Sequence, residues 1–194
     1  YFDSFEHYYS LYQRRNLDLW AEYADGKVTK EELNRQRYLY PLEAVGAGDS
    51  TLAKAYERDA LTMIPTKSKL MPHAREVLEY LSGKYNLYIL SNGFKELQSH
   101  KMRSSGIDEY FKKVVLSDDI GILKPWPEIF HFALSTTQSE LNNSLMIGDS
   151  WENDIVGAAG VGMHQVFYNL SGRTDLPFAP TYQITDLKDL FNFL

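Results

Sequence analysis

From Pro65 onward, short apolar runs alternate with segments of helical periodicity, and this alternation constrains the fold more than any other feature of the sequence. The runs are short enough to be buried strands. They cover residues 87–90, 114–116, 145–147, 165–168 and an edge strand at 182–185. Because helices separate most of these runs, the pattern predicts an α/β fold in which a parallel sheet carries helices on both faces.

The residues before Pro65 contain helical periodicity alone. Aromatic and apolar side chains recur at helical spacing over Phe5–Tyr23, and Thr29–Glu32 forms a capping box for a second helix. This second helix is predicted to end before Pro41, because proline breaks a helix interior. Asp49 or Ser50 can cap a third helix.

We therefore predict two domains, a helical one over residues 1–66 and an α/β one over residues 67–194. The 26 acidic and 20 basic residues give a formal charge of −6, and no basic patch for nucleic acid is present. Cysteine is absent, which excludes disulfides and thiolate metal sites. With neither a signal peptide nor an apolar run of membrane-spanning length, the sequence is typical of a cytoplasmic protein.

Two carboxylates follow the predicted strand at 145–147. Gly148 would let the chain turn, and Asp149 and Asp154 would then lie at the carboxyl end of the strand, where open α/β sheets bind ligands. Carboxylate oxygens suit Mg²⁺, which also keeps waters and a substrate phosphate. The alternative is an ordinary turn in which Asp149 caps the following helix.

Polar groups also follow the other predicted strands. Ser91 offers a hydroxyl, and Asn92 and Gly93 offer backbone N–H groups at a helix N-terminus, where anions are stabilised. Lys124 precedes Pro125 and could present its ammonium from a rigid segment. Taken singly, these are ordinary loop and surface residues, and only their order after successive strands suggests a shared phosphate site.

These segments together resemble motifs two, three and four of the haloacid dehalogenase-like hydrolases. The matching residues are Leu90–Gly93, Leu123–Pro125 with Glu128–Phe130, and Ile147–Ser150 with Asp154. The resemblance implies a Rossmann-like core beneath a helical cap formed by residues 1–66. It also implies that Ser91 and Asn92 bind the phosphoryl group, that Lys124 neutralises nucleophile and phosphate, and that Asp149 and Asp154 hold Mg²⁺, with Lys124 and Asp149 taking part in catalysis.

The first motif of that family, Asp-x-Asp at the end of the first strand, has no match, since no two aspartates are separated by a single residue. The family places its cap after this motif, and this chain begins within the helical pattern. We therefore expect that the strand carrying the nucleophile is missing from the core, and that the chain without it is inactive. Its loss would leave unpaired backbone groups in the sheet.

The resemblance implies Mg²⁺-dependent hydrolysis of a phosphomonoester through an aspartyl-phosphate. The form Gly148–Ser150 is typical of phosphatases and argues against the dehalogenase branch. The Ser91–Phe94 and Ser117–Lys124 segments are similar to those of pyrimidine 5′-nucleotidases, which makes a pyrimidine nucleoside monophosphate the preferred substrate. Cap aromatic residues such as Trp20 could stack on its base. Another sugar phosphate or phosphoglycolate is the nearest alternative.

Two further classes of protein compete with an enzyme. One is a non-catalytic family member that binds a small phosphorylated metabolite in the same pocket. The other is a phosphate-receiver domain, which also uses Asp and Lys at strand ends. The long helical segment before the strands and the pair of Asp149 and Asp154 argue against a receiver domain.

Overall fold

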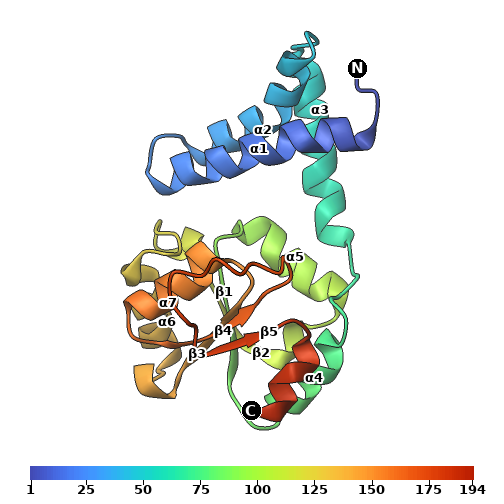
Figure 1. The fold of residues 1–194 in the computed structure, drawn as a ribbon. Helices are drawn as coiled ribbons and strands as arrows, with labels where there is room; N and C mark the ends of the chain where they lie inside the picture. Colours follow the sequence, from blue (N-terminus) through green and yellow to red (C-terminus); the bar gives the residue numbers. More distant parts are fainter. The chain divides into compact units, whose positions relative to one another are not determined.

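The computed structural model describes all residues from Tyr1 to Leu194, and they form two compact units. One unit comprises Tyr1–Thr66 and the other Lys67–Leu194. The first contains helices alone, whereas the second alternates strands and helices (Figure 1). No helix combines the length and the apolar character that crossing a membrane would require.

Three α-helices make up the first unit: α1 (Phe5–Ala24), α2 (Lys30–Ala44) and α3 (Ser50–Met63). Each begins after a residue whose side chain accepts a backbone hydrogen bond from the first turn, namely Ser4, Thr29 or Asp49. The prediction that Pro41 ends the second helix is wrong, because α2 continues to Ala44. Pro41 is fully buried, so the apolar contacts of its ring offset the single hydrogen bond that proline cannot make.

The core of this helical unit is small. Its main cluster of buried residues is Tyr38, Leu39, Leu42 and Ala53, against which Phe2, Tyr12 and Tyr56 pack. Leu19 is the one buried residue of α1, and Ala53 is the one buried residue of α3. The other contributions of these two helices to the interior come from half-buried side chains such as Tyr12 and Tyr56, which pack against the core.

The second unit has five strands and four α-helices. The strands are β1 (Leu87–Ser91), β2 (Phe111–Leu116), β3 (Leu145–Gly148), β4 (His164–Tyr168) and β5 (Tyr182–Ile184). The helices are α4 (Ala74–Ser82), α5 (Lys95–Ser105), α6 (Pro127–Thr137) and α7 (Gly157–Gly160). A π-helical turn covers Trp151–Val156, and a 3-10 helix covers Leu187–Asn192.

Helix ends in this unit differ from the predicted ones in two places. Proline suits the first turn of a helix, but α4 begins at Ala74, after Pro72, because His73 has a left-handed conformation with a φ of 61°. After Asp149, where the sequence suggested a single helix, the chain forms the π-helical turn and then the short α7.

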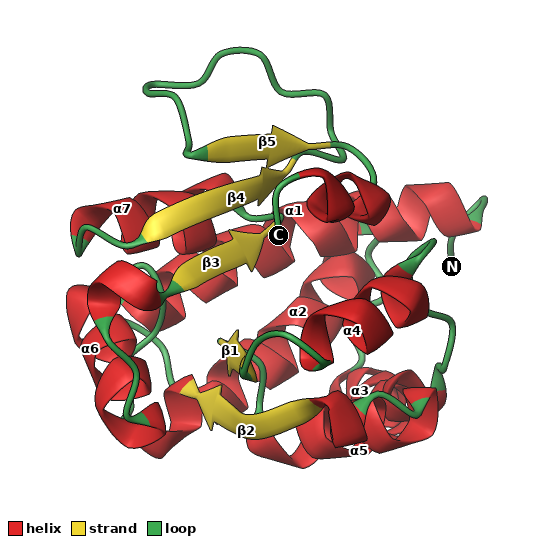
Figure 2. Cartoon of the chain, turned by 90° about the horizontal axis from the view of Figure 1, so that it is seen from below, coloured by secondary structure: helices red, strands yellow, loops and turns green.

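The strands form two parallel sheets instead of one continuous sheet (Figure 2). β1 pairs with β2, with Ser91 opposite Leu116, and β4 lies between β3 and β5. β1 and β3 do not pair, so each leaves one edge without a partner strand. All residues of β1 and β3 are half-buried, whereas four of the five residues of β4 are buried.

Helices pack on both faces of the larger sheet. On one face, Val77 and Leu81 of α4 contact Val166 and Tyr168 of β4. Phe167, which points the other way because side chains alternate along a strand, packs on Trp151. The predicted α/β class with parallel strands and helices on both faces is therefore confirmed.

Candidate functional site

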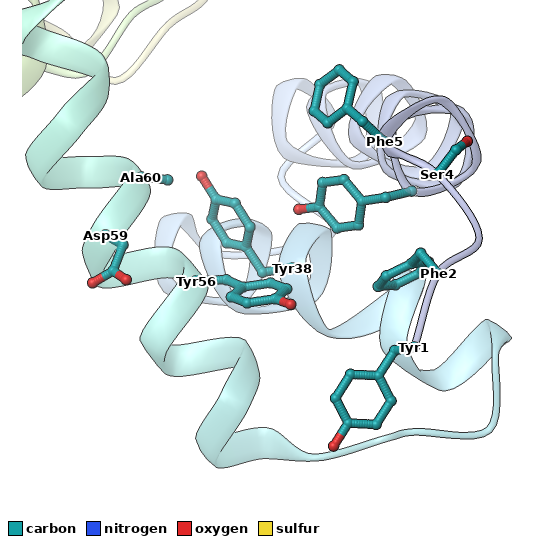
Figure 3. A pocket seen from close by; sticks show the side chains of 9 residues that line it. Tyr1, Phe2, Ser4, Phe5, Tyr38, Tyr56, Asp59 and Ala60 are labelled. Atoms are coloured by element: carbon teal, nitrogen blue, oxygen red, sulfur yellow. The ribbon is translucent and has the colours of Figure 1, made fainter.

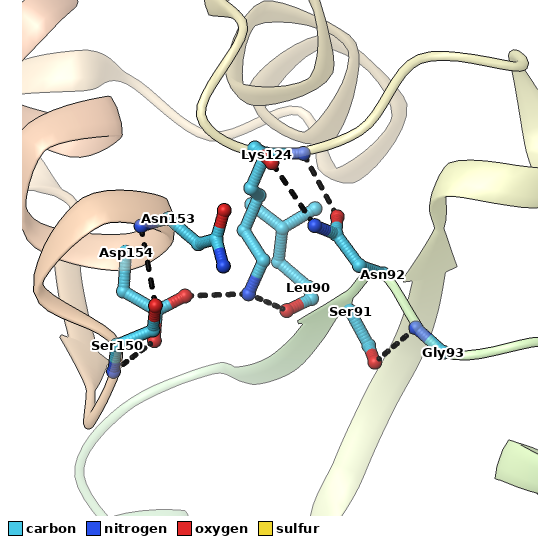
Figure 4. A network of polar contacts seen from close by, with 8 residues as sticks. All are labelled: Leu90, Ser91, Asn92, Gly93, Lys124, Ser150, Asn153 and Asp154. Carbon is cyan, nitrogen blue, oxygen red and sulfur yellow. Dashed lines mark hydrogen bonds and ion pairs between the residues drawn. The ribbon is translucent and has the colours of Figure 1, made fainter. Parts of the chain in front are cut away.

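The predicted site residues come from the ends of two strands that belong to different sheets. Ser91 is the last residue of β1, and Asp149 directly follows β3. Lys124 lies in the loop before α6, and Asp154 lies in the π-helical turn after β3. Figure 4 shows that a network of polar contacts connects most of these elements.

Lys124 is the centre of that network. Its side chain is buried, and Nζ donates hydrogen bonds to Asp154 Oδ1 at 2.6 Å and to the Leu90 carbonyl oxygen at 2.9 Å (Figure 4). A buried ammonium is stable only when such partners replace its water. Because Leu90 belongs to β1 and Asp154 follows β3, the lysine connects the edges of the two sheets.

Asn92 fixes the backbone from which Lys124 projects. Its Nδ2 donates to the Lys124 carbonyl oxygen at 3.0 Å, and its Oδ1 accepts from the Lys124 N–H at 2.8 Å (Figure 4). The side-chain amide is thus committed to a neighbouring loop, whereas the sequence suggested the backbone N–H of Asn92 for anion binding. Its position gives it a second role, which is to orient the lysine.

The Asp154 carboxylate has a second partner besides Lys124. Oδ2 accepts a hydrogen bond from the Ser150 N–H at 3.0 Å. The carboxylate also lies against Gly148, where an added Cβ would be 2.3 Å from Oδ2. Gly148 is therefore required because it leaves space for Asp154. The sequence suggested that Gly148 allows the chain to turn, but its φ is not positive, so backbone conformation does not require glycine here.

Ser91 is half-buried at the end of β1. Its Oγ accepts a hydrogen bond from the Gly93 N–H at 2.9 Å, which leaves its own hydrogen available to donate. The Gly93 N–H was expected to face an anion directly. In the structure it donates to the serine hydroxyl instead. The hydroxyl is then the group that can donate a hydrogen bond to a phosphate oxygen.

Asp149 is exposed, whereas Asp154 is buried. No cluster of three or more His, Cys, Asp or Glu side chains with metal-ligand geometry occurs in the structure. Mg²⁺ is commonly held by one or two carboxylates together with water and substrate phosphate. Two aspartates of this kind suit such an ion: Asp149 is exposed to solvent, and Asp154 is held in place by Lys124 and the Ser150 N–H.

Sequence patterns could not reveal every member of this network. The Leu90 carbonyl and the Ser150 N–H are backbone groups, and any side chain could have carried them. The space requirement at Gly148 is also invisible without the position of Asp154. The only sequence signal for these groups was their place beside strand ends.

Comparison with known proteins gives matches that cover between half and nearly all of the chain. The family model described as haloacid dehalogenase-like hydrolase matches residues 2–162. The pyrimidine 5′-nucleotidase YjjG of Escherichia coli strain K12 is 30% identical over 185 residues, which cover 94% of this chain and 80% of that protein. A glyceraldehyde 3-phosphate phosphatase of Pyrococcus abyssi is 38% identical over 99 residues, which cover 50% of this chain and 42% of that protein.

A solved structure is similar over the same extent. The magnesium-bound crystal structure of YfnB from Bacillus subtilis, a protein described as a putative HAD-hydrolase, superposes with a TM-score of 0.88 at 27% identity. The superposition covers 96% of this chain and 82% of that one. The parallel strands and flanking helices described above are therefore a Rossmann-like arrangement shared with that protein.

Proposed function

Because the chain belongs to the haloacid dehalogenase-like hydrolases, we propose that its strand-end site serves Mg²⁺-dependent hydrolysis of a small phosphomonoester. The observation that carries this proposal is the buried Lys124, held by Asp154, Leu90 and Asn92 beside the Ser91 hydroxyl. A fixed positive charge and a nearby hydroxyl donor suit the oxygens of a transferring phosphoryl group.

Each residue has a distinct task in this proposal. Ser91 donates a hydrogen bond to a phosphoryl oxygen. Lys124 opposes the negative charge that phosphate and nucleophile bring together. Asp149 and Asp154 would hold Mg²⁺, which when bound supplies further positive charge at the phosphate. The Asn92 side chain orients Lys124 through its two hydrogen bonds with the Lys124 backbone. The backbone N–H of Asn92, in the loop after β1, would donate to a phosphoryl oxygen.

The nucleophile needs a further strand, because the sequence contains no Asp-x-Asp. We place that strand between β1 and β3, whose facing edges lack partners and whose residues are only half-buried. Its leading aspartate would attack phosphorus and expel the alcohol, forming an aspartyl-phosphate. Water would then cleave this ester to release phosphate and regenerate the carboxylate. Without such a strand, we expect the 194-residue chain to show no turnover.

For the substrate we propose a pyrimidine nucleoside 5′-monophosphate in the cytoplasm, with a small sugar phosphate or phosphoglycolate as the alternative. The similarity to the Escherichia coli pyrimidine 5′-nucleotidase over 94% of the chain supports the first choice. The match to a glyceraldehyde 3-phosphate phosphatase, which covers 50% of the chain, supports the second.

Phosphate release from a panel of phosphomonoesters with Mg²⁺ tests the proposal. The 194-residue chain is compared with a form lengthened before Tyr1 by an apolar strand that ends in Asp-x-Asp. We expect activity only in the lengthened form, highest on pyrimidine nucleoside monophosphates. Preference for small sugar phosphates would select the alternative substrate class.

Asp149→Asn in the lengthened form serves as the variant for the metal site. We expect it to abolish Mg²⁺-dependent turnover, since it removes a charged ligand. Near-normal turnover would exclude Asp149 from the metal site. A folded, lengthened protein that binds phosphate but does not turn over would favour the non-catalytic family member.

A further inference from the structure

Two cavities of the helical unit differ in their chemistry. The one near the start of the chain is lined mainly by aromatic rings, and Asp59 is its single ionised side chain (Figure 3). The other has a volume of about 430 Å³, within the roughly 300–1,000 Å³ of pockets that hold small molecules. Every side chain that lines this polar cavity carries a polar or charged group: Arg14, Arg15, Asp18, Gln36 and Tyr40.

Two neighbouring helices supply the polar cavity. Arg14 and Asp18 are one turn apart on α1, and Gln36 and Tyr40 are one turn apart on α2. Residues four apart lie on the same face of a helix. Because α1 and α2 pack side by side (Figure 1), one pair of residues from each helix bounds the cavity.

Arg15 is the one residue of the polar cavity whose charge is already neutralised. Its Nη1 donates to Glu22 Oε1 at 2.8 Å, and its Nη2 donates to Glu22 Oε2 at 3.3 Å, two turns further along α1. These hydrogen bonds to Glu22 raise the pKa of Arg15 above its ordinary value. The guanidinium therefore reaches past Asp18, which is nearer in sequence, and makes no ion pair with it.

The side chains of Arg14 and Asp18 have no partner within the chain. Opposite charges one turn apart on a helix can pair, yet no hydrogen bond or ion pair joins these two residues to each other or to another side chain. The Gln36 amide and the Tyr40 hydroxyl, both of half-buried residues, make no hydrogen bond either. The polar cavity thus presents four unengaged groups, which are a cation, an anion, an amide and a hydroxyl.

The balance of charge limits what this cavity can bind. Because Glu22 neutralises Arg15, the charges of Arg14 and Asp18 leave no net charge there. A simple anion would be attracted by Arg14 but repelled by Asp18, and a simple cation would meet the reverse. An apolar group would take both charges out of water without compensation. A ligand that carries one charge of each sign satisfies both residues.

We propose that the polar cavity binds a free α-amino acid with a polar, uncharged side chain. The ligand carboxylate accepts hydrogen bonds from Arg14, whose forked donors match a carboxylate, and the ligand ammonium donates to Asp18. The Gln36 amide and the Tyr40 hydroxyl on α2 remain available for the polar side chain of the ligand. This site lies within residues 1–66 and goes beyond the proposed phosphatase function, since binding there requires no turnover.

Calorimetric titration of the full chain with four probes tests this site. L-Glutamine carries both charges, N-acetyl-L-glutamine lacks the ammonium, L-glutaminamide lacks the carboxylate, and uridine is a neutral ring compound. We expect L-glutamine to bind at least about tenfold more tightly than each of the other three, because each of them loses a charged hydrogen bond. Equal binding of L-glutamine and either single-charge analogue, tighter binding of uridine, or no binding of L-glutamine would overturn the proposal.

Arg14→Met and Asp18→Asn test the two charged groups separately. We expect each to lower L-glutamine affinity by about tenfold or more. Asp18→Asn should also bind L-glutamine and N-acetyl-L-glutamine equally, and Arg14→Met should bind L-glutamine and L-glutaminamide equally. The matched control is Arg35→Met, which removes an exposed arginine of α2 outside the cavity and should leave affinity unchanged. Affinity that survives both cavity variants would contradict the assignment.

Thermal unfolding without a probe shows whether these variants act through the fold. Because the side chains of Arg14 and Asp18 have no partner in the free chain, we expect both variants to keep the Tm of wild type. A marked drop in Tm in both would assign the two residues to the stability of the helical unit and would overturn their role in binding.

Asp149→Asn separates this site from the phosphatase site. The probes contain no phosphate, so we expect this variant to bind L-glutamine as wild type does. Binding that Asp149→Asn abolishes and Arg14→Met preserves would place the probe in the second unit and overturn the cavity proposal. Failure of the cavity test therefore leaves the phosphatase proposal standing, and the reverse is also true.

Discussion

Each unit of this protein buries one cationic side chain, and the two differ in their hydrogen-bond partners. Lys124, in the α/β unit, donates to a carboxylate and a carbonyl, and its backbone is held by Asn92. Arg37, in the helical unit, has one amide partner and an Nε without any. Both are less than one-tenth exposed, at 8% and 7%.

The charge of Lys124 is neutralised by a buried carboxylate, whereas the charge of Arg37 has no carboxylate partner. Burying an ion is costly unless partners replace its hydration, so Lys124 should be part of what stabilises its surroundings. Arg37 should instead cost stability in the free chain.

Methionine at each position is the strongest test of this comparison. Lys124→Met leaves the Asp154 carboxylate buried without a cation, and we expect a loss of about 3–5 kcal/mol in the free energy of unfolding. Arg37→Met should cause no loss. Urea unfolding followed by circular dichroism measures both. Similar losses in the two variants would show that the two cations are equivalent, and Lys124→Met with Asp154→Leu should recover most of the loss.

The space around the Lys124 partner provides the next test. Gly148→Ala would bring a methyl group to 2.3 Å from Asp154 Oδ2, so the carboxylate must shift, and we expect a loss of about 1–3 kcal/mol. Gly160→Ala is the matched control, because nothing lies within 4 Å of its added Cβ. Thermal unfolding should place the control at or above wild type. A Gly148→Ala protein of wild-type stability would mean that Asp154 is not fixed.

Asn92→Ala removes the two hydrogen bonds that hold the Lys124 backbone. At roughly 0.5–1.5 kcal/mol each, their loss should cost about 1–2 kcal/mol, since the site is partly exposed to water. Asn143→Ala, which removes one exposed contact with Glu140, should be nearly neutral. If the two variants unfold at the same urea concentration, the fold does not depend on the Asn92 contacts.

Alkaline pH provides the smallest expected effect, and it concerns the helical unit. Burial raises the pKa of Tyr8 from 10.0 to about 12, so the folded state keeps its proton longer than the unfolded state. Its contribution is complete below pH 10 and is lost as pH rises toward 12. Two pKa units correspond to about 2.7 kcal/mol, and partial exposure reduces this to the order of 1 kcal/mol. Over this pH range the Tm of Tyr8→Phe should fall less than that of wild type. An identical fall in Tm would contradict the burial of the Tyr8 hydroxyl.

The sequence predicted the α/β class because it depends on short apolar runs, which are local and periodic. Helix starts at Thr29 and Asp49 were predictable for the same reason, since a cap interacts with its own first turn. The passage of α2 through Pro41 was not, because it depends on burial by distant residues. The split of the strands into two sheets likewise depends on pairing between segments far apart in sequence.

Within the candidate site, the sequence placed Ser91, Lys124 and Asp154 at strand ends but could not say which of them interact. Lys124 and Asp154 are 30 residues apart, and their contact depends on how two loops pack. The isolation of Arg37 left no signal at all, because an arginine between helix residues usually faces solvent. Its burial and its unpartnered Nε became apparent only in the folded structure.

The link that Lys124 makes between Leu90 and Asp154 has a consequence for ionic strength. Dissolved ions weaken interactions between exposed charges, but they cannot surround a pair whose side chains are 10% and 6% exposed. Concentrated salt should therefore weaken exposed pairs, such as that of Arg58 with Asp59, well before it weakens this one. The electrostatic connection between the two sheets should consequently be the same in dilute buffer and in a salt-rich cell.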